Sequence, residues 1–187
     1  MRDLEQINPS FRGQFLLAHP ALDDANFRRT VILISDHNAE DGAMGLVWNR
    51  PLETTLAKAF KRFYGSGLED VPLFKGGPVQ EDTLLLVAWE WQTDGGGFKL
   101  HFGIPVDDLI ALKATHPDLL VRAFKGYSGW TEGQLEGELA NNAWLVTPVS
   151  QDLLDHMNGT KEWQKLVTTV RPELGFLAQA PDDPGVN

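Results

Sequence analysis

The chain has 187 residues, of which 42% are hydrophobic, so it is long enough to bury the core of one domain. Its 16 Lys and Arg are outnumbered by 26 Asp and Glu, and the formal net charge of −10 disfavours direct nucleic-acid binding. The lack of cysteine excludes disulfides, thiol nucleophiles and cysteine-based metal sites. No run approaches the ~18 apolar residues of a membrane helix. The first residues show no secretory signal pattern, so we expect a cytoplasmic protein without membrane association.

The first part of the chain predicts three β-strands. Residues 13–20 form an apolar run that ends in a proline, and 29–38 is rich in β-branched residues. Residues 42–50 resume the pattern after Asp41-Gly42, a dipeptide typical of turns. The second and third runs therefore predict a β-hairpin, with the first strand beside it.

The middle of the chain alternates between the two kinds of pattern. In 51–65 the apolar residues recur on one helical face, and the final glycine suits a helix end. Residues 71–79 predict a short strand that runs into a double-glycine turn. Residues 82–91 and 98–105 predict a second hairpin around the glycine-rich turn 93–97.

The next part of the chain predicts a helix followed by a strand, twice in succession. Residues 105–115 predict a helix and 117–127 a strand. In 131–142, leucines recur every four residues, and Thr131 and Gln134 have the spacing of a capping box. Residues 143–148 predict another strand.

The C-terminal part predicts two short helices, 150–158 and 159–170. Residues 171–187 contain three prolines and little apolar periodicity, so we expect an extended or disordered tail after a single domain of residues 1–170. Strands come in runs with helices placed irregularly between them. This order predicts an α+β fold with a mixed, mostly antiparallel sheet and flanking helices.

Few local patterns predict catalysis. Ser128 lies in the sequence GYSGW, but Trp130 occupies the place of the second glycine of a nucleophile elbow, which favours an ordinary loop serine. The five histidines lack metal-ligand spacing, so we expect no metal site and no cofactor. The densest basic segments, 27–29 and 58–63, are both short.

Other polar positions have two possible interpretations each. The corner at His37 and Asn38 either forms a turn or gathers ligand-binding side chains. The amides at Gly76-Gly77 could hold an anion or simply form a tight turn. Glu138 and Asn142 border the apolar face of their helix, where they could face a ligand or hydrogen-bond nearby backbone.

The segment GQFLLAHPALDDANFRRTVILISDHNAEDGAMGLVWNRPL (13–52) resembles the opening of the YqgE/AlgH family. The motifs KGGPV and GYSGWTEGQLEGELANNAWL and the late Trp163 follow in the family's order, so the resemblance covers about residues 13–170. It implies a compact α+β fold with a strongly curved, barrel-like sheet. The family's characteristic residues fall on Pro20, Asp24, Phe27, Val31, His37, Gly42, Gly45, Asn49, Gly76, Gly77, Pro78, Gly126, Tyr127, Trp130, Gly133, Gln134, Leu135, Glu138 and Trp144.

The chain departs from the family pattern at Ser35, where relatives often carry cysteine, and in the strand LLLVAWEW, where many have Leu-His. The resemblance implies no settled biochemical activity. Members are often labelled transcriptional regulators, a label that fits poorly with the net charge of −10 and the lack of a helix-turn-helix pattern.

Three functions remain open at this point. The leading hypothesis is a regulatory binding module that holds a small ligand or a protein partner in one groove. The alternative is a hydrolase-like enzyme with His37 as general base, Asp24 or Glu138 orienting it, and glycine amides stabilising an oxyanion. The third is direct DNA binding. The groove candidates are Asp24, His37, Asn38, Asn49, Gly76, Gly77, Tyr127, Trp130, Glu138 and Asn142.

Overall fold

Nine strands build the sheet at the centre of the computed structural model, which describes residues 10–38, 40–92 and 97–181. They are β1 (Gln14–Ala18), β2 (Val31–Asn38), β3 (Gly42–Val47), β4 (Pro51–Thr55), β5 (Pro72–Lys75), β6 (Val79–Trp91), β7 (Phe98–Phe102), β8 (Leu120–Trp130) and β9 (Trp144–Pro148). The predicted hairpins are present as the antiparallel pairs β2–β3 and β6–β7. The predicted glycine-rich turn of the second hairpin falls mostly outside the described residues.

The sheet is mixed and open. Its main path runs β4-β5-β8-β3-β2-β1-β9, and β6 joins through its pairing with β8. Among the described strands, β5 and β8 pair in parallel, and all other pairs are antiparallel. The expected mixed, mostly antiparallel sheet is confirmed, but the path ends at β4 and β9, so the sheet curves without closing into a barrel.

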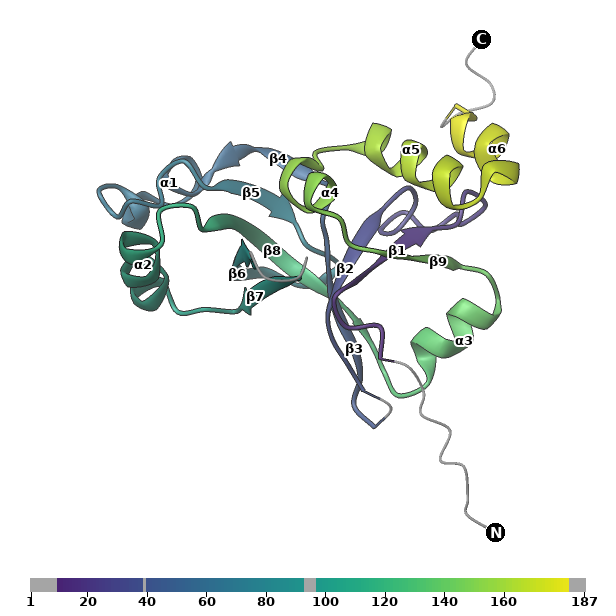
Figure 1. Cartoon of the computed structure of the whole chain (residues 1–187), viewed down its shortest axis with the longest axis horizontal. Coiled ribbons are helices and arrows are strands. Elements are labelled where there is room, and N and C mark those ends of the chain that lie inside the picture. Colours follow the sequence, from purple (N-terminus) through teal and green to yellow (C-terminus); the bar gives the residue numbers. More distant parts are fainter. Residues whose placement is uncertain (1–9, 39, 93–96, 182–187) are drawn as a thin grey trace.

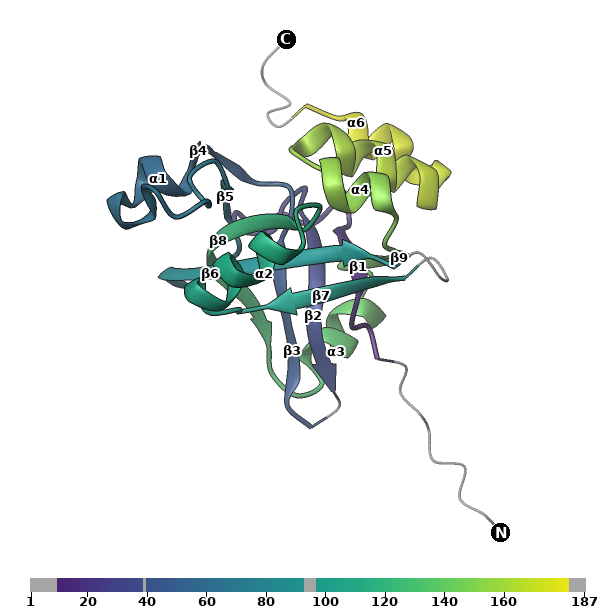
Figure 2. The ribbon, with the colours of Figure 1, turned by 60° about the vertical axis from the view of Figure 1, so that its left-hand side comes forward.

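Helices flank this sheet (Figures 1 and 2). They are α1 (Leu56–Ala59), α2 (Val106–Thr115), α3 (Gln134–Ala140), α4 (Gln151–His156), α5 (Thr160–Val170) and α6 (Gly175–Gln179), with the 3-10 turns η1 (Lys61–Phe63) and η2 (Pro172–Leu174). In both views α4, α5 and α6 gather on one side, while α3 lies apart from them near the β2–β3 hairpin. None of the described helices is long and apolar enough to cross a membrane.

The long strand β8 joins the two parts of the sheet. Its first half pairs with β5 and β6, and its last three residues pair with β3. Three apolar clusters result: one between the sheet and α4–α6, one under α1 and α2, and one under α3. The third cluster contains Trp130 and Trp144, so the motif GYSGW ends in a strand that is buried beneath α3 rather than in a loop.

Two expectations for secondary structure differ from the structure. Residues 51–65 begin as strand β4, and α-helix covers only 56–59, with the short 3-10 turn η1 after it. Edge strand β4 pairs with β5, and this tertiary pairing overrides the helical periodicity. The segment after 170 is also not an extended tail, since η2 and α6 follow α5 and Ala178 is buried in the main core. Residues 182–187 lie outside the described part of the chain.

Candidate functional site

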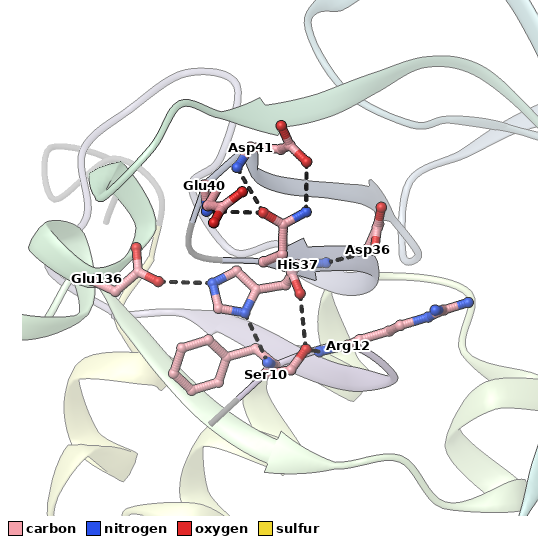
Figure 3. A network of polar contacts seen from close by, with 9 residues as sticks. Ser10, Arg12, Asp36, His37, Glu40, Asp41 and Glu136 are labelled. Atoms are coloured by element: carbon pink, nitrogen blue, oxygen red, sulfur yellow. Dashed lines mark hydrogen bonds and ion pairs between the residues drawn. The ribbon is translucent and has the colours of Figure 1, made fainter. Parts of the chain in front are cut away.

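His37 forms a polar contact between the sheet and α3 (Figure 3). Its Nε2 lies 2.8 Å from Oε1 of Glu136, and its Nδ1 accepts a hydrogen bond of 3.1 Å from the amide of Phe11. Because Nδ1 is an acceptor, the ring proton is on Nε2 and is donated to the Glu136 carboxylate. The His37 side chain is 2% exposed, so both ring nitrogens are engaged and shielded from solvent.

This geometry does not support His37 as a general base. A general base needs a free lone pair directed at a substrate, and the one lone pair of the neutral ring is occupied by a backbone amide. The carboxylates expected to orient it lie elsewhere: Asp24 caps its own loop, and Glu138 contacts two tryptophans. The actual partner, Glu136, was not among the groove candidates.

The charge state of Glu136 follows from this contact. Its burial would raise the pKa, but a hydrogen bond from its own backbone amide and the hydrogen bond from His37 outweigh that effect and lower the pKa below its usual value. Glu136 is therefore ionised at neutral pH. Its pairing with a buried imidazole attaches α3 to the end of β2.

Asn38 caps the β2–β3 turn beside this contact. Its Oδ1 accepts hydrogen bonds from the amides of Glu40 and Asp41, and its Nδ2 donates to Asp41 Oδ2 at 2.8 Å. These are the contacts of an Asx turn. The residues at this corner therefore form a turn, which was one of its two interpretations.

Glu138 holds two tryptophans on one carboxylate oxygen. Its Oε2 accepts hydrogen bonds from Nε1 of Trp130 at 2.8 Å and Nε1 of Trp144 at 2.7 Å. Gln134 donates to the other oxygen at 2.9 Å. The ring of Phe27 stacks on Trp130 with centroids 6.4 Å apart and meets Trp144 edge-on with centroids 5.7 Å apart. The hydrogen bonds of Glu138 to the two tryptophans of the apolar cluster under α3 attach this helix to β8 and β9.

Gly76 and Gly77 pack directly against the backbone of β8. A Cβ on Gly76 would lie 2.3 Å from the carbonyl oxygen of Gly126, and one on Gly77 would lie 2.2 Å from that of Tyr127. The Gly76 amide donates to the carbonyl of Lys125, and its carbonyl accepts from the buried hydroxyl of Ser128. The pair therefore permits close backbone packing, and the Gly76 amide is not available as an oxyanion donor.

The remaining candidates lie in different parts of the fold. Asn142 is exposed just after α3 with a φ of +58°, and its backbone amide donates to the carbonyl of Leu139. Tyr127 is half-buried against the main core. Asn49 lies beside the start of β2 and the residue before α5, and Asp24 lies in the loop before β2, near Arg50.

Asn49 is the candidate that organises a cavity. Its Oδ1 accepts from the amide of Val31 at 2.8 Å, and its Nδ2 donates to the carbonyls of Arg29 and Gly159 at 3.0 Å and 3.1 Å. Asn49 is 4% exposed, so these hydrogen bonds are shielded from solvent. They join the start of β2, the preceding loop and the residue before α5, and a cavity lies between that loop and the start of α5.

We call this space the arginine cavity. It has a volume of about 180 Å³ and is lined by Ala25, Arg28, Arg29, Asn49, Arg50 and Thr160. An adjoining space of about 540 Å³, the α5 hollow, shares Arg29 and Thr160 and is otherwise lined by residues 158, 159, 161, 162 and 164. The two together are within the size range of small-molecule sites.

Arg50 is held rigidly at this cavity. Its Nη1 donates to the carbonyl of Asn26 at 2.7 Å and its Nη2 to that of Arg28 at 3.0 Å. Burial lowers the pKa of Arg50, the nearby charge of Arg28 lowers it further, and Asp24 opposes both. The sequence signal for this site was the basic segment 27–29; nothing in the sequence indicated that Arg50 and Thr160 would join it.

In the part of the chain that the structure describes, no group of three or more His, Asp or Glu side chains could hold a metal ion.

Comparison with known proteins places the chain among bacterial relatives. The sequence profile of the AlgH-like family matches residues 15–175. A UPF0301 protein of Streptomyces avermitilis is 36% identical over 190 residues, which cover 95% of this chain and 96% of the relative. A UPF0301 protein of Chlorobium limicola is 31% identical over 196 residues and covers 100% of both chains.

Two solved structures have a similar fold. The solution structure of the AlgH protein from Pseudomonas aeruginosa has a TM-score of 0.65 and 26% sequence identity, covering 98% of this chain and 100% of that one. A crystal structure of a Corynebacterium diphtheriae protein has a TM-score of 0.68 at 20% identity and covers 95% of each chain, which bears on the fold alone.

Proposed function

The chain belongs to the AlgH-like family, and we propose that it is a regulatory binding module that takes a small ligand into the arginine cavity and the adjoining α5 hollow. The observation that carries this proposal is the arrangement around Asn49. The buried side-chain amide of Asn49 hydrogen-bonds three separate backbone segments, and two of them, the loop before β2 and the start of α5, contribute residues to the cavity wall. Small ligands bind in preformed concave sites where a few polar groups are held in fixed positions.

The enzymatic alternative receives less support. The imidazole of His37 is shielded and its Nδ1 lone pair is occupied, and the Gly76 amide is bonded within the sheet. A hydrolase mechanism would need each of these groups at a substrate. The residues proposed for that chemistry instead connect elements of the fold.

A thermal-unfolding screen tests the proposal. A compound present at about 100 times its dissociation constant stabilises a protein by ~2.7 kcal/mol, which for a domain of this size is a shift of roughly 5–10 °C. We expect such a shift for at least one class among nucleotides, sugar phosphates, carboxylates and neutral metabolites. A flat response across all classes would contradict the proposal.

Two tryptophan variants locate the ligand. Thr160 is exposed and lines both spaces, so Thr160→Trp should fill the cavity and abolish the shift. Thr169 is exposed on the same helix outside both spaces, so Thr169→Trp is the matched control and should respond like the original chain. A shift that survives Thr160→Trp would place the ligand elsewhere and refute this site.

A further inference from the structure

Asn158 and Gly159 lie in the short connection 157–159 between α4 and α5 (Figure 1). They form the one asparagine–glycine pair in the whole sequence. An asparagine side chain can react with the backbone nitrogen of the next residue, and glycine hinders this reaction least because it has no Cβ. The contacts of the folded protein then decide whether the pair is able to react.

Both reacting groups of this pair are accessible. Asn158 is exposed and Gly159 is half-buried. Among the residues that the structure describes, none forms a hydrogen bond with the Asn158 carboxamide or with the Gly159 N–H. This includes Glu162, whose carboxylate lies near Gly159 at the spacing of a capping-box partner. The asparagine side chain can therefore turn onto the amide without breaking a hydrogen bond.

Two other asparagines show how the fold protects this residue type elsewhere. Asn26 is also exposed, but the N–H of the next residue, Phe27, donates to Oδ1 of Asp24 at 3.1 Å. Asn49 is 4% exposed, and three hydrogen bonds hold its carboxamide. In both cases a reacting group is occupied and the next residue carries a side chain. The connection before α5 has neither kind of protection.

We propose that Asn158 is a site of spontaneous deamidation. The Gly159 nitrogen loses its proton to solvent and attacks the side-chain carbonyl carbon of Asn158, and the bond from that carbon to the side-chain nitrogen breaks. This nitrogen takes up a proton and leaves as ammonia, and a cyclic succinimide remains. Water then opens the ring at either carbonyl, which gives aspartate or isoaspartate. The reaction uses no ligand, so the proposal holds independently of the proposed function.

Deamidation changes the connection in two ways. Each product adds one negative charge to the formal net charge of −10, in the wall of the α5 hollow that Asn158 lines. Isoaspartate also lengthens the backbone by a methylene group between Met157, which is buried in the main core, and Gly159, whose carbonyl accepts from Nδ2 of Asn49 at 3.1 Å. The longer connection should weaken the Asn49 hydrogen bond, which attaches the start of α5 to the loop before β2.

Peptide mapping by mass spectrometry, after incubation of the folded protein at neutral pH, tests the proposal. The peptide that contains Asn158 should gain the mass of an amide-to-acid conversion at least about tenfold faster than the peptide that contains Asn26. Its products should separate into aspartate and isoaspartate forms. Incubation in concentrated urea gives the rate of the unfolded chain. A rate in the folded protein more than about tenfold below the rate in urea would show that the fold protects Asn158, and would overturn the proposal.

Gly159→Ala is the matched variant, because it alters the reaction without straining the backbone. Gly159 has an extended φ of 168°, and an added Cβ would lie 3.6 Å from Oε2 of Glu162, an ordinary contact. The added methyl group hinders the attack, so deamidation of Asn158 should slow about tenfold. Circular dichroism checks that the variant is folded. An unchanged rate would mean that residue 159 is not the nucleophile and would refute the mechanism.

The stability of the aged protein tests the structural consequence. The isoaspartate form, separated by ion exchange, should melt roughly 2–4 °C below the original chain, as expected for the loss of about one hydrogen bond. Asn158→Asp carries the same charge without the added methylene group and should melt like the original chain. An isoaspartate form that melts together with Asn158→Asp would contradict the weakening of the Asn49 contact.

Discussion

The Nε2 of His37 lies 2.8 Å from the Oε1 of Glu136, although the two residues are 99 positions apart in the chain. One comes from the end of β2 and the other from α3. The contact joins a buried imidazole to a carboxylate that is 31% exposed. It attaches a helix to the sheet, and it makes the attachment sensitive to acid.

The first prediction concerns acid stability. Because folding lowers the pKa of Glu136, its contribution is fully present above the unfolded pKa and is lost as pH falls through the lower folded value. Glu136→Gln removes this linkage. Between about pH 5 and pH 3, we expect the free energy of unfolding to fall less steeply in the Gln variant than in the original chain. Urea unfolding at a series of pH values measures this, and parallel curves would contradict it.

The second prediction concerns the two indoles on Glu138. Glu138→Ala leaves Nε1 of Trp130 and of Trp144 without their acceptor, so we expect a loss of about 2–4 kcal/mol in the free energy of unfolding. Glu138→Gln keeps an acceptor oxygen and should cost less. The control is Glu132→Ala at an exposed position, with an expected effect within ~0.5 kcal/mol. Chemical denaturation followed by tryptophan fluorescence distinguishes the three variants.

The third prediction uses two glycines with opposite surroundings. Gly77 has a φ of +153°, and an added Cβ would lie 2.2 Å from a backbone oxygen, so Gly77→Ala should cost about 3 kcal/mol or more or prevent folding. Gly137 lies in α3 with open space around it, so Gly137→Ala should stabilise the protein by ~0.5–1 kcal/mol. Melting temperatures of the two variants should move in opposite directions. A tolerated alanine at position 77 would show that the close packing of this turn on β8 can relax.

The fourth prediction concerns Arg122 in the main core. The residue is 5% exposed, lies 4.5 Å from the centroid of Phe74 and 4.9 Å from that of Trp48, and donates to the carbonyls of Trp48 and Asp155. Burial lowers its pKa to about 10, so the side chain remains charged at neutral pH.

Arg122→Ala should therefore cost about 3–5 kcal/mol, because it opens a cavity and leaves two buried carbonyls without donors. The comparison is Arg62→Ala, an exposed arginine over Phe60 and Phe63, whose loss should cost no more than ~1 kcal/mol. Urea unfolding at pH 7 measures both. A small effect at position 122 would mean that the surrounding aromatic rings pack as well without the cation.

Local sequence patterns predicted the elements that are specified by residues close together in the chain. The β-branched run before Asp41-Gly42 predicted the β2–β3 hairpin, because alternation and a turn dipeptide act over a few residues. The helix expected over 159–170 is present as α5. The prediction for 51–65 was wrong because a contact distant in sequence decides its structure. Pairing of β4 with β5 overrides the helical spacing of this segment.

The sequence by itself determined that the chain forms an α+β domain with a mixed sheet, since composition and periodicity are properties of short segments. Only the tertiary structure decided what the polar residues do. Glu136 meets His37 and Asn49 joins three backbone segments because the sheet brings together residues about 100 positions apart. Hydrogen bonds depend on distance and angle in space, which no spacing along the chain encodes. For that reason the arginine cavity could be found only once β2, β3 and α5 were in place.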